Sequence, residues 1–254
     1  MANATFNAHV DFFGLQAATS NALKIKSSNE NRSKQSASGA NLYGDAAVVD
    51  SYGETAAPSA EYDIVGALTQ AVLPVLGSLN TPTELAKPVV LGSVTINTRT
   101  GEAPSLSASG QMVQTGAAQL RSYTLPAFSV STRHRAQDFL GLCNIKKGSA
   151  TADDVEDYGL ASVSATFPIE FTLAQPQGEV VNYDLHGGMA TCDFEMQWYA
   201  STAPTVELTS AATALGATIT TPVTKGTPQN GYTTYTWQIS FPMTGIEYVA
   251  QSNS

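Results

Sequence analysis

Residues 94–109 have the sequence VTINTRTGEAPSLSAS. Apolar and polar side chains alternate along 94–98 and again along 105–109, which is the two-residue period of a strand with one buried face. Between the two runs lies Gly101, and glycine accepts the backbone angles that tight turns need. This stretch therefore predicts a β-hairpin.

Short alternating runs bounded by glycine, proline, asparagine and serine continue along most of the chain, and helical spacing is scarce. Residues 44–50 and 57–64 predict another hairpin, with a turn at 51–55. Residues 67–79 are apolar but contain a proline and a glycine, so either a short helix or two strands joined by a loop fits them. The other predicted strands cover residues 22–26, 166–173, 179–183, 191–199, 233–241 and 246–249.

The best helix candidate is residues 133–143, where apolar side chains recur at helical spacing. The acidic stretch 153–157 follows a turn, and Thr151 is suited to cap it as a short helical turn. Acidic side chains are favoured near a helix N-terminus, so this stretch needs no metal ion to explain it. The expected fold class is mainly β, a β-sandwich or barrel in a single domain, residues 1–254, with one short flanking α-helix and long loops.

Two long segments lack a clear strand pattern. Residues 27–41 are polar and rich in serine and asparagine, and they predict a long loop. Loops of this length are usually functional, or disordered until something binds them, so we expect this one to contact a neighbouring subunit. Residues 201–231 are rich in Thr, Ala and Gly, contain three prolines, and predict a surface excursion.

Charged residues make up only 13% of the chain, against an average of about 25%. Uncharged hydroxyl and amide side chains must cover the surface instead, and they cost less to desolvate at a subunit interface than ions do. Their abundance fits equally well with the preference of threonine for strands. The low charge thus permits self-assembly without demanding it.

The net charge of −9 is unevenly distributed. Residues 1–149 carry eleven basic and ten acidic side chains, whereas residues 150–254 carry eleven acids and a single base, Lys225. An acidic surface repels nucleic acid backbones and acidic lipid headgroups. We therefore expect no specific nucleic-acid binding and no membrane binding.

The chain shows no apolar stretch of membrane-spanning length and no basic and apolar start of a secretory signal, so we expect synthesis in the cytosol. Its two cysteines, Cys143 and Cys192, are too few for a disulfide framework. Reduced, buried thiols are the expected state.

Metal and catalytic motifs are missing from the sequence. His9, His134 and His186 stand far apart, and the acidic stretch 153–157 lacks the ligand spacing of a calcium loop. No nucleophile elbow, phosphate-binding loop or dinucleotide-binding glycine motif is present. We expect no metal, no cofactor and no enzymatic activity, although a catalytic cluster assembled in space from one of these histidines would leave no sequence motif.

The order of these patterns resembles that of phage major tail proteins, which build the tail tube. In residues 22–64 the resemblance rests on a strand, a long polar segment, Gly44-Asp45 before a second strand, and Tyr52-Gly53-Glu54 leading into APSAEY at 57–62. In residues 92–110 it rests on a strand, Gly101-Glu102-Ala103-Pro104, and a strand ending in Ser109-Gly110. About half of the chain is covered by this resemblance.

The resemblance implies subunits joined edge to edge in rings, and rings stacked into a tube whose lumen carries DNA. Implied partners are copies of the chain itself, a tape measure protein and tail terminator or tip proteins, with DNA only in transit. The protein would reside in the virion tail and, during assembly, in the host cytoplasm. Candidate residues for the contact between rings are Lys24, Lys26, Arg32 and Lys34. Candidate lumen-facing acids are Asp153, Asp154, Glu156, Asp157, Glu179 and Asp184.

Two other functions fit the same composition. A phage capsid or decoration protein would share the low charge and the threonine-rich strands, but would form closed oligomers or bind a shell. A carbohydrate-binding adhesin module would use strand aromatics as a platform for sugar rings, although such aromatics more often lie in a core or interface. The platform would consist of Trp198, Tyr199, Tyr232, Tyr235 and Trp237.

Overall fold

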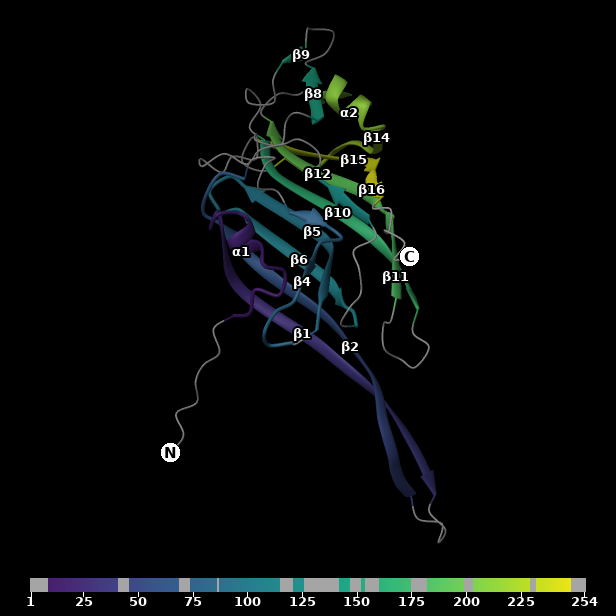
Figure 1. Cartoon of the computed structure of the whole chain (residues 1–254). Coiled ribbons are helices and arrows are strands. Elements are labelled where there is room, and N and C mark those ends of the chain that lie inside the picture. Colours follow the sequence, from purple (N-terminus) through teal and green to yellow (C-terminus); the bar gives the residue numbers. More distant parts are fainter. Residues whose placement is uncertain are drawn as a thin grey trace.

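The protein is described by a computed structural model, which covers residues 9–40, 46–68, 74–85, 87–114, 121–125, 142–146, 152–153, 160–174, 182–198, 203–228 and 232–247. The chain is mainly β, as predicted, and is dominated by one large antiparallel sheet (Figure 1). Two strands of this sheet extend as a narrow arm well beyond the other strands (Figure 1).

The large sheet, called the main sheet below, has ten strands within the described ranges. Along its continuous path the strands follow the order β1 (Leu23–Ala40), β2 (Ala46–Ile64), β6 (Ser105–Met112), β5 (Val89–Arg99), β10 (Leu160–Ala174), β12 (Met189–Trp198), β15 (Thr233–Pro242) and β14 (Thr218–Lys225). In addition, β11 (Asn182–Gly187) pairs with β10, and β4 (Leu79–Asn80) pairs with β5. Neighbouring strands are antiparallel throughout.

Smaller elements accompany the main sheet. One small sheet contains β13 (Thr205–Leu208), β8 (Cys143–Lys146) and β9 (Ala152–Asp153), and another contains β16 (Gly245–Glu247), β7 (Arg121–Thr124) and β3 (Val75–Leu76). The described helices are α1 (Leu15–Ala18) and α2 (Ser210–Ala214). Residues 75–76 and 79–80 thus form two short strands with Gly77 and Ser78 between them, which favours two strands joined by a loop over a helix in this described part of 67–79.

The hairpin expected at 94–109 is confirmed. Strands β5 and β6 pair with Ile96 opposite Leu106, and Gly101 in the connecting turn has a positive φ of 87°. Ile96 and Leu106 are fully buried, whereas Asn97 and Ser107 are exposed. The alternation in the sequence therefore corresponds to one core face and one outer face.

The core lies on one face of the main sheet. Neighbouring strands contribute a continuous apolar row to it: Tyr62, Leu106, Ile96, Ala165, Cys192 and Ile239. The N-terminal segment and the small sheets supply the side chains that pack with this face, among them Phe12, Phe13, Leu15, Leu76, Tyr123, Leu142 and Val206. Each large apolar side chain buried in this way stabilises the fold by roughly 1.5–3 kcal/mol.

The N-terminal segment is fastened to the sheet by Asp11. Its carboxylate accepts hydrogen bonds from the backbone N–H groups of Leu15 (3.1 Å) and Gln16 (2.9 Å) at the start of α1. It also accepts one from the Tyr62 hydroxyl on β2 (2.6 Å). Burial, together with Asp11, raises the pKa of Tyr62. With Phe12, Phe13 and Leu15 buried as well, detaching this segment would cost roughly 5–9 kcal/mol in apolar burial alone.

The structure corrects the prediction of a loop at 27–41, because residues 27–40 belong to strand β1. It also corrects the hairpin predicted within 44–64, because β2 continues through the expected turn at 51–55. Ser33 pairs with Thr55 and Gln35 with Tyr52, so β2 has one extra residue at this point. Gly53, which in the sequence suggested a turn, lies at a β-bulge of β2.

Two further predictions need correction. The segment 201–231 contains β13, α2 and β14, and β14 is an exposed edge strand of the main sheet instead of an irregular excursion. Threonines favour a strand there, and an edge strand tolerates Pro222. Asp153 lies in β9 and not in a helical turn, and Cys143 begins β8 and does not end a helix. The rest of the predicted helix up to residue 141, and Thr151, lie outside the described residues.

Cys143 and Cys192 are free and buried, as predicted. Burial raises the pKa of both thiols from 9.0 to about 12. Trp237 opposes this rise in pKa at Cys143, whereas Cys143 and Asp193 add to it at Cys192. The protonated form is therefore the one that the folded state stabilises.

This burial predicts a loss of stability in alkali. Between pH 9 and pH 12 the unfolded thiols ionise while the folded ones stay protonated, so each should lower the free energy of unfolding by up to about 1.4 kcal/mol per pH unit. Urea unfolding at a series of pH values should show a shallower decline for the Cys143→Ala/Cys192→Ala variant than for the wild type. An equally steep decline of the unfolding free energy in the two proteins would contradict the raised pKa of the buried thiols.

Candidate functional site: the outer sheet face and the arm

The face of the main sheet opposite the core is lined by polar side chains and is called the outer face below. The strand register places its residues in rows that cross neighbouring strands. One row consists of Ser105, Asn97, Ser164, Asp193, Gln238 and Thr221. The next consists of Ser107, Thr95, Thr166, Thr191, Ser240 and Thr218.

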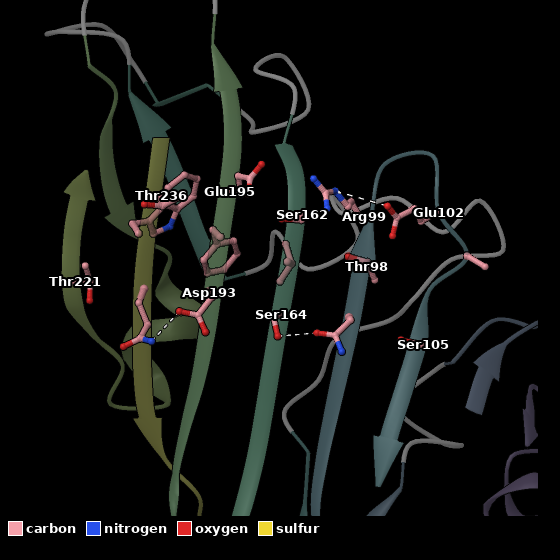
Figure 2. Close-up of a pocket in the computed structure, with 16 residues that line it drawn as sticks. Thr98, Arg99, Glu102, Ser105, Ser162, Ser164, Asp193, Glu195, Thr221 and Thr236 are labelled. Carbon is pink, nitrogen blue, oxygen red and sulfur yellow. Dashed lines mark hydrogen bonds and ion pairs between the residues drawn. The ribbon is translucent and has the colours of Figure 1, made fainter. Parts of the chain in front are cut away.

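Hydrogen bonds link neighbouring strands along these rows (Figure 2). The Ser164 hydroxyl donates to Oδ1 of Asn97 (2.7 Å), and Nε2 of Gln238 donates to Oδ1 of Asp193 (2.7 Å). In the second row the hydroxyls of Thr95 and Thr166 lie 3.1 Å apart. Side chains that satisfy one another in this way are held in place at the surface without a bound partner.

A shallow trough of about 460 Å³ follows the first row. At one rim Arg99 pairs with Glu102, with Nε and Oε1 3.9 Å apart, while Asp193 and Glu195 face the trough from β12 (Figure 2). These four charged residues give the described trough a net charge of −2. The trough is therefore acidic, and half of its lining residues carry hydroxyl or amide side chains.

Asp193 and Glu195 were absent from the predicted lumen-facing acids. The signal that could have found them is present in the sequence, because they alternate with the buried Cys192, Phe194 and Met196 along β12. In a two-faced strand, acids at alternate positions must share the outer face. A search for runs of neighbouring acids does not find this pair, because Asp193 and Glu195 are not adjacent in the sequence.

The arm consists of residues 30–40 of β1 and 46–58 of β2, which pair with each other, whereas the pairing of β2 with β6 begins only at Ser59 (Figure 1). At a rise of about 3.3 Å per residue the arm is roughly 40 Å long. Since its strands pair only with each other in the described structure, each carries an outer edge of backbone N–H and C=O groups.

The four basic residues predicted to contact another ring lie in β1 and not in a loop. Lys24 is exposed at the root of the strand, and Lys34 lies farther along the arm. Lys26 binds Glu61 (3.0 Å), which holds the pKa of Lys26 above its usual value. Arg32 binds both Glu30 (2.6 Å) and Glu54 (3.5 Å). Acids within the same chain thus neutralise much of the expected positive charge.

The predicted lumen-facing acids are not brought together by the described structure. Asp153 lies in β9, in a small sheet apart from the main one. Asp184 lies in β11, close to Arg121 (3.8 Å) and His186 (3.4 Å). The other four predicted acids, Asp154, Glu156, Asp157 and Glu179, lie outside the described residues.

The aromatic platform required by the carbohydrate-binding alternative does not form. Tyr235 and Trp237 point into the core, with exposed fractions of 0% and 2%. Trp237 stacks on Phe194 with ring centroids 5.2 Å apart. Trp198 also packs against the core, Tyr232 is half exposed, and Tyr199 lies outside the described residues. Strand alternation turns Trp198, Tyr235 and Trp237 inward.

Among the described residues, no three His, Cys, Asp or Glu side chains gather in a way that could hold a metal ion. No described helix is long and apolar enough to cross a membrane. No protein-family model matches this chain, and no curated protein matches its sequence.

Neighbouring residues of β15 should respond very differently to truncation. Trp237→Ala should lower the free energy of unfolding by about 3–5 kcal/mol, because it removes a buried aromatic side chain. Gln238→Ala, on the outer face, should lower it by less than about 1 kcal/mol. Urea unfolding measures both, and a nearly neutral Trp237→Ala would contradict the inward orientation of the β15 aromatics.

Proposed function

We propose that this chain is a structural protein that assembles with copies of itself into stacked rings, forming a tube of the kind built by phage major tail proteins. The observation that carries the proposal is the arm, residues 30–40 and 46–58, which projects from a well-packed body. In this proposal the arm reaches a neighbouring copy, and the outer face of the main sheet lines the channel.

The arm supports assembly because a two-stranded ribbon is at best marginally stable in water by itself. A strand edge gains stability when a further strand or another surface covers it. The arm carries five charged residues, but Arg32 already pairs with Glu30 and Glu54 within the chain, and serines and alanines make up much of the rest. Covering the arm therefore need not leave these three ions unpaired. A neighbouring copy would supply the missing cover.

The outer face supports a role as a conduit for DNA. Several of its hydroxyl and amide side chains satisfy one another, as in the Ser164–Asn97 and Gln238–Asp193 bonds. Asp193 and Glu195 add negative charge, and repulsion keeps a polyanion from settling into binding minima along its path. A surface of this kind suits passage better than retention.

Negative-stain electron microscopy of the purified chain at rising concentration tests the proposal. Hollow tubes, or rings with a central channel, are expected. Tube growth in the family can depend on an initiator, so the experiment should be repeated with preformed tube fragments as seeds. Closed shells or binding to a capsid surface would favour the decoration alternative, and monomers under both conditions would contradict assembly.

A shortened arm should abolish assembly without unfolding the body. Gln35 and Tyr52 are paired, so replacing residues 36–51 by Asn-Gly closes the ribbon with a tight two-residue turn. The pairing of β2 with β6 is untouched. We expect a urea midpoint close to that of the wild type but no tubes by electron microscopy. Normal tubes from this variant would refute the role of the arm.

Reversing one charge in the trough should make assembled tubes retain DNA. Asp193→Lys changes the outer face, whereas Glu84→Lys introduces the same charge change at an exposed site outside the trough. Co-sedimentation of short duplex DNA with tubes at low salt should rise for Asp193→Lys and stay near the wild-type level for Glu84→Lys. Equal retention by the two variants would contradict a channel lined by the outer face.

A further inference from the structure

The body of the main sheet ends in two edge strands, β1 at one side and β14 at the other. Unprotected strand edges recruit further strands, so a protein that assembles at a chosen place must close the others. The root of β1, residues 23–25, continues directly into the arm. How this root is protected therefore bears on where another copy can add.

The outward N–H groups at the root of β1 are bound by side chains of the N-terminal segment. The Thr19 hydroxyl accepts from the N–H of Leu23 (3.2 Å) and itself donates to the carbonyl of Leu15 (2.8 Å). Oε1 of Gln16 accepts from the N–H of Ile25 (3.4 Å). A strand approaching this edge would find both donors occupied.

The segment that supplies these side chains is firmly held. Phe12, Phe13 and Leu15 are buried in the core, and Asp11 binds both the start of α1 and Tyr62. The N–H of Val10 also binds the hydroxyl of Ser28 on β1 (2.9 Å). The protection of the root is thus built into the folded body and not supplied by a loosely attached tail.

The opposite edge is protected in a different way. Pro222 in the middle of β14 has no N–H to offer a further strand. The pairing of β14 with β15 also shifts register twice, between Ile219 and Thr221 and again between Thr221 and Thr224. A proline and irregular register are both known means of blocking edge pairing.

We propose that residues 9–22 act as an edge guard that closes the root of β1, so that a second copy of the chain can add a strand only at the arm. This inference rests on the proposed self-assembly and refines it. The resemblance implies that subunits join edge to edge, and the guard leaves the arm as the edge that is open to another copy. Along the sheet path as the structure describes it, β1 and β14 run in opposite directions. Copies side by side in a ring would therefore bring β14 against β1 in antiparallel fashion, which is the contact that the guard prevents.

The test uses the shortened arm, in which residues 36–51 are replaced by Asn-Gly, so that assembly through the arm does not contribute. In this background Gln16→Ala/Thr19→Val removes both caps from the β1 edge. The matched control is Gln111→Ala/Thr213→Val, which removes a half-buried glutamine and a threonine that also donates to a backbone carbonyl four residues earlier. Sedimentation velocity at rising concentration measures self-association, and near-ultraviolet circular dichroism checks folding.

The uncapped variant should self-associate at a concentration at least about tenfold lower than the control, and adding Pro222→Thr should strengthen this association further. If Gln16→Ala/Thr19→Val fails to fold, Gln16→Ala alone exposes the N–H of Ile25 and should give a smaller shift in the same direction. A folded, uncapped variant that stays as monomeric as the control would overturn the guard. So would strong association of the shortened-arm protein with its caps intact. Because every variant compared here carries the same shortened arm, neither outcome depends on whether the wild type forms tubes.

Discussion

Burial of one face of the main sheet is the interaction on which the rest of the structure depends. Eight successive strands along the described path turn their apolar side chains to the same side, and the N-terminal segment and the small sheets pack there. Because the side-chain period of a strand is two, the residues between must face outward. The polar rows through Asn97, Ser164, Asp193 and Gln238 are thus a geometric consequence of the core. The same geometry turns Trp237 away from the surface.

The edges of the sheet obey a second constraint, since every backbone N–H and C=O group needs a partner or water. Within the body, Thr19 and Gln16 occupy donors at the root of β1, and Pro222 interrupts β14. In the described structure the strands of the arm pair only with each other, and the arm leaves the body as a ribbon. Protected edges on the body and one projecting ribbon are what the proposed assembly through the arm requires.

The sequence predicted those elements whose residues alternate over a core. The hairpin of β5 and β6 was predicted because Ile96 and Leu106 stand out between polar neighbours, and β12 and β15 were predicted for the same reason. The arm could not be recognised in this way, because its sequence lacks a regular alternation of large apolar and polar residues and the bulge at Gly53 resembles a turn. Of the candidate site, the acidity of the second half was predictable, but the meeting of Asp193 with Gln238 depends on strand order, which single-strand patterns do not contain.

The central claim, that copies join through the arm, is tested most directly by amide hydrogen exchange on the wild-type chain, compared between dilute subunits and assembled particles. We expect residues 30–40 and 46–58 to gain protection on assembly, while the already bonded amides of Leu23 and Ile25 keep the protection they have in the dilute subunit. Assembled particles in which the arm exchanges as fast as in the dilute subunit, with new protection along β14 instead, would contradict it.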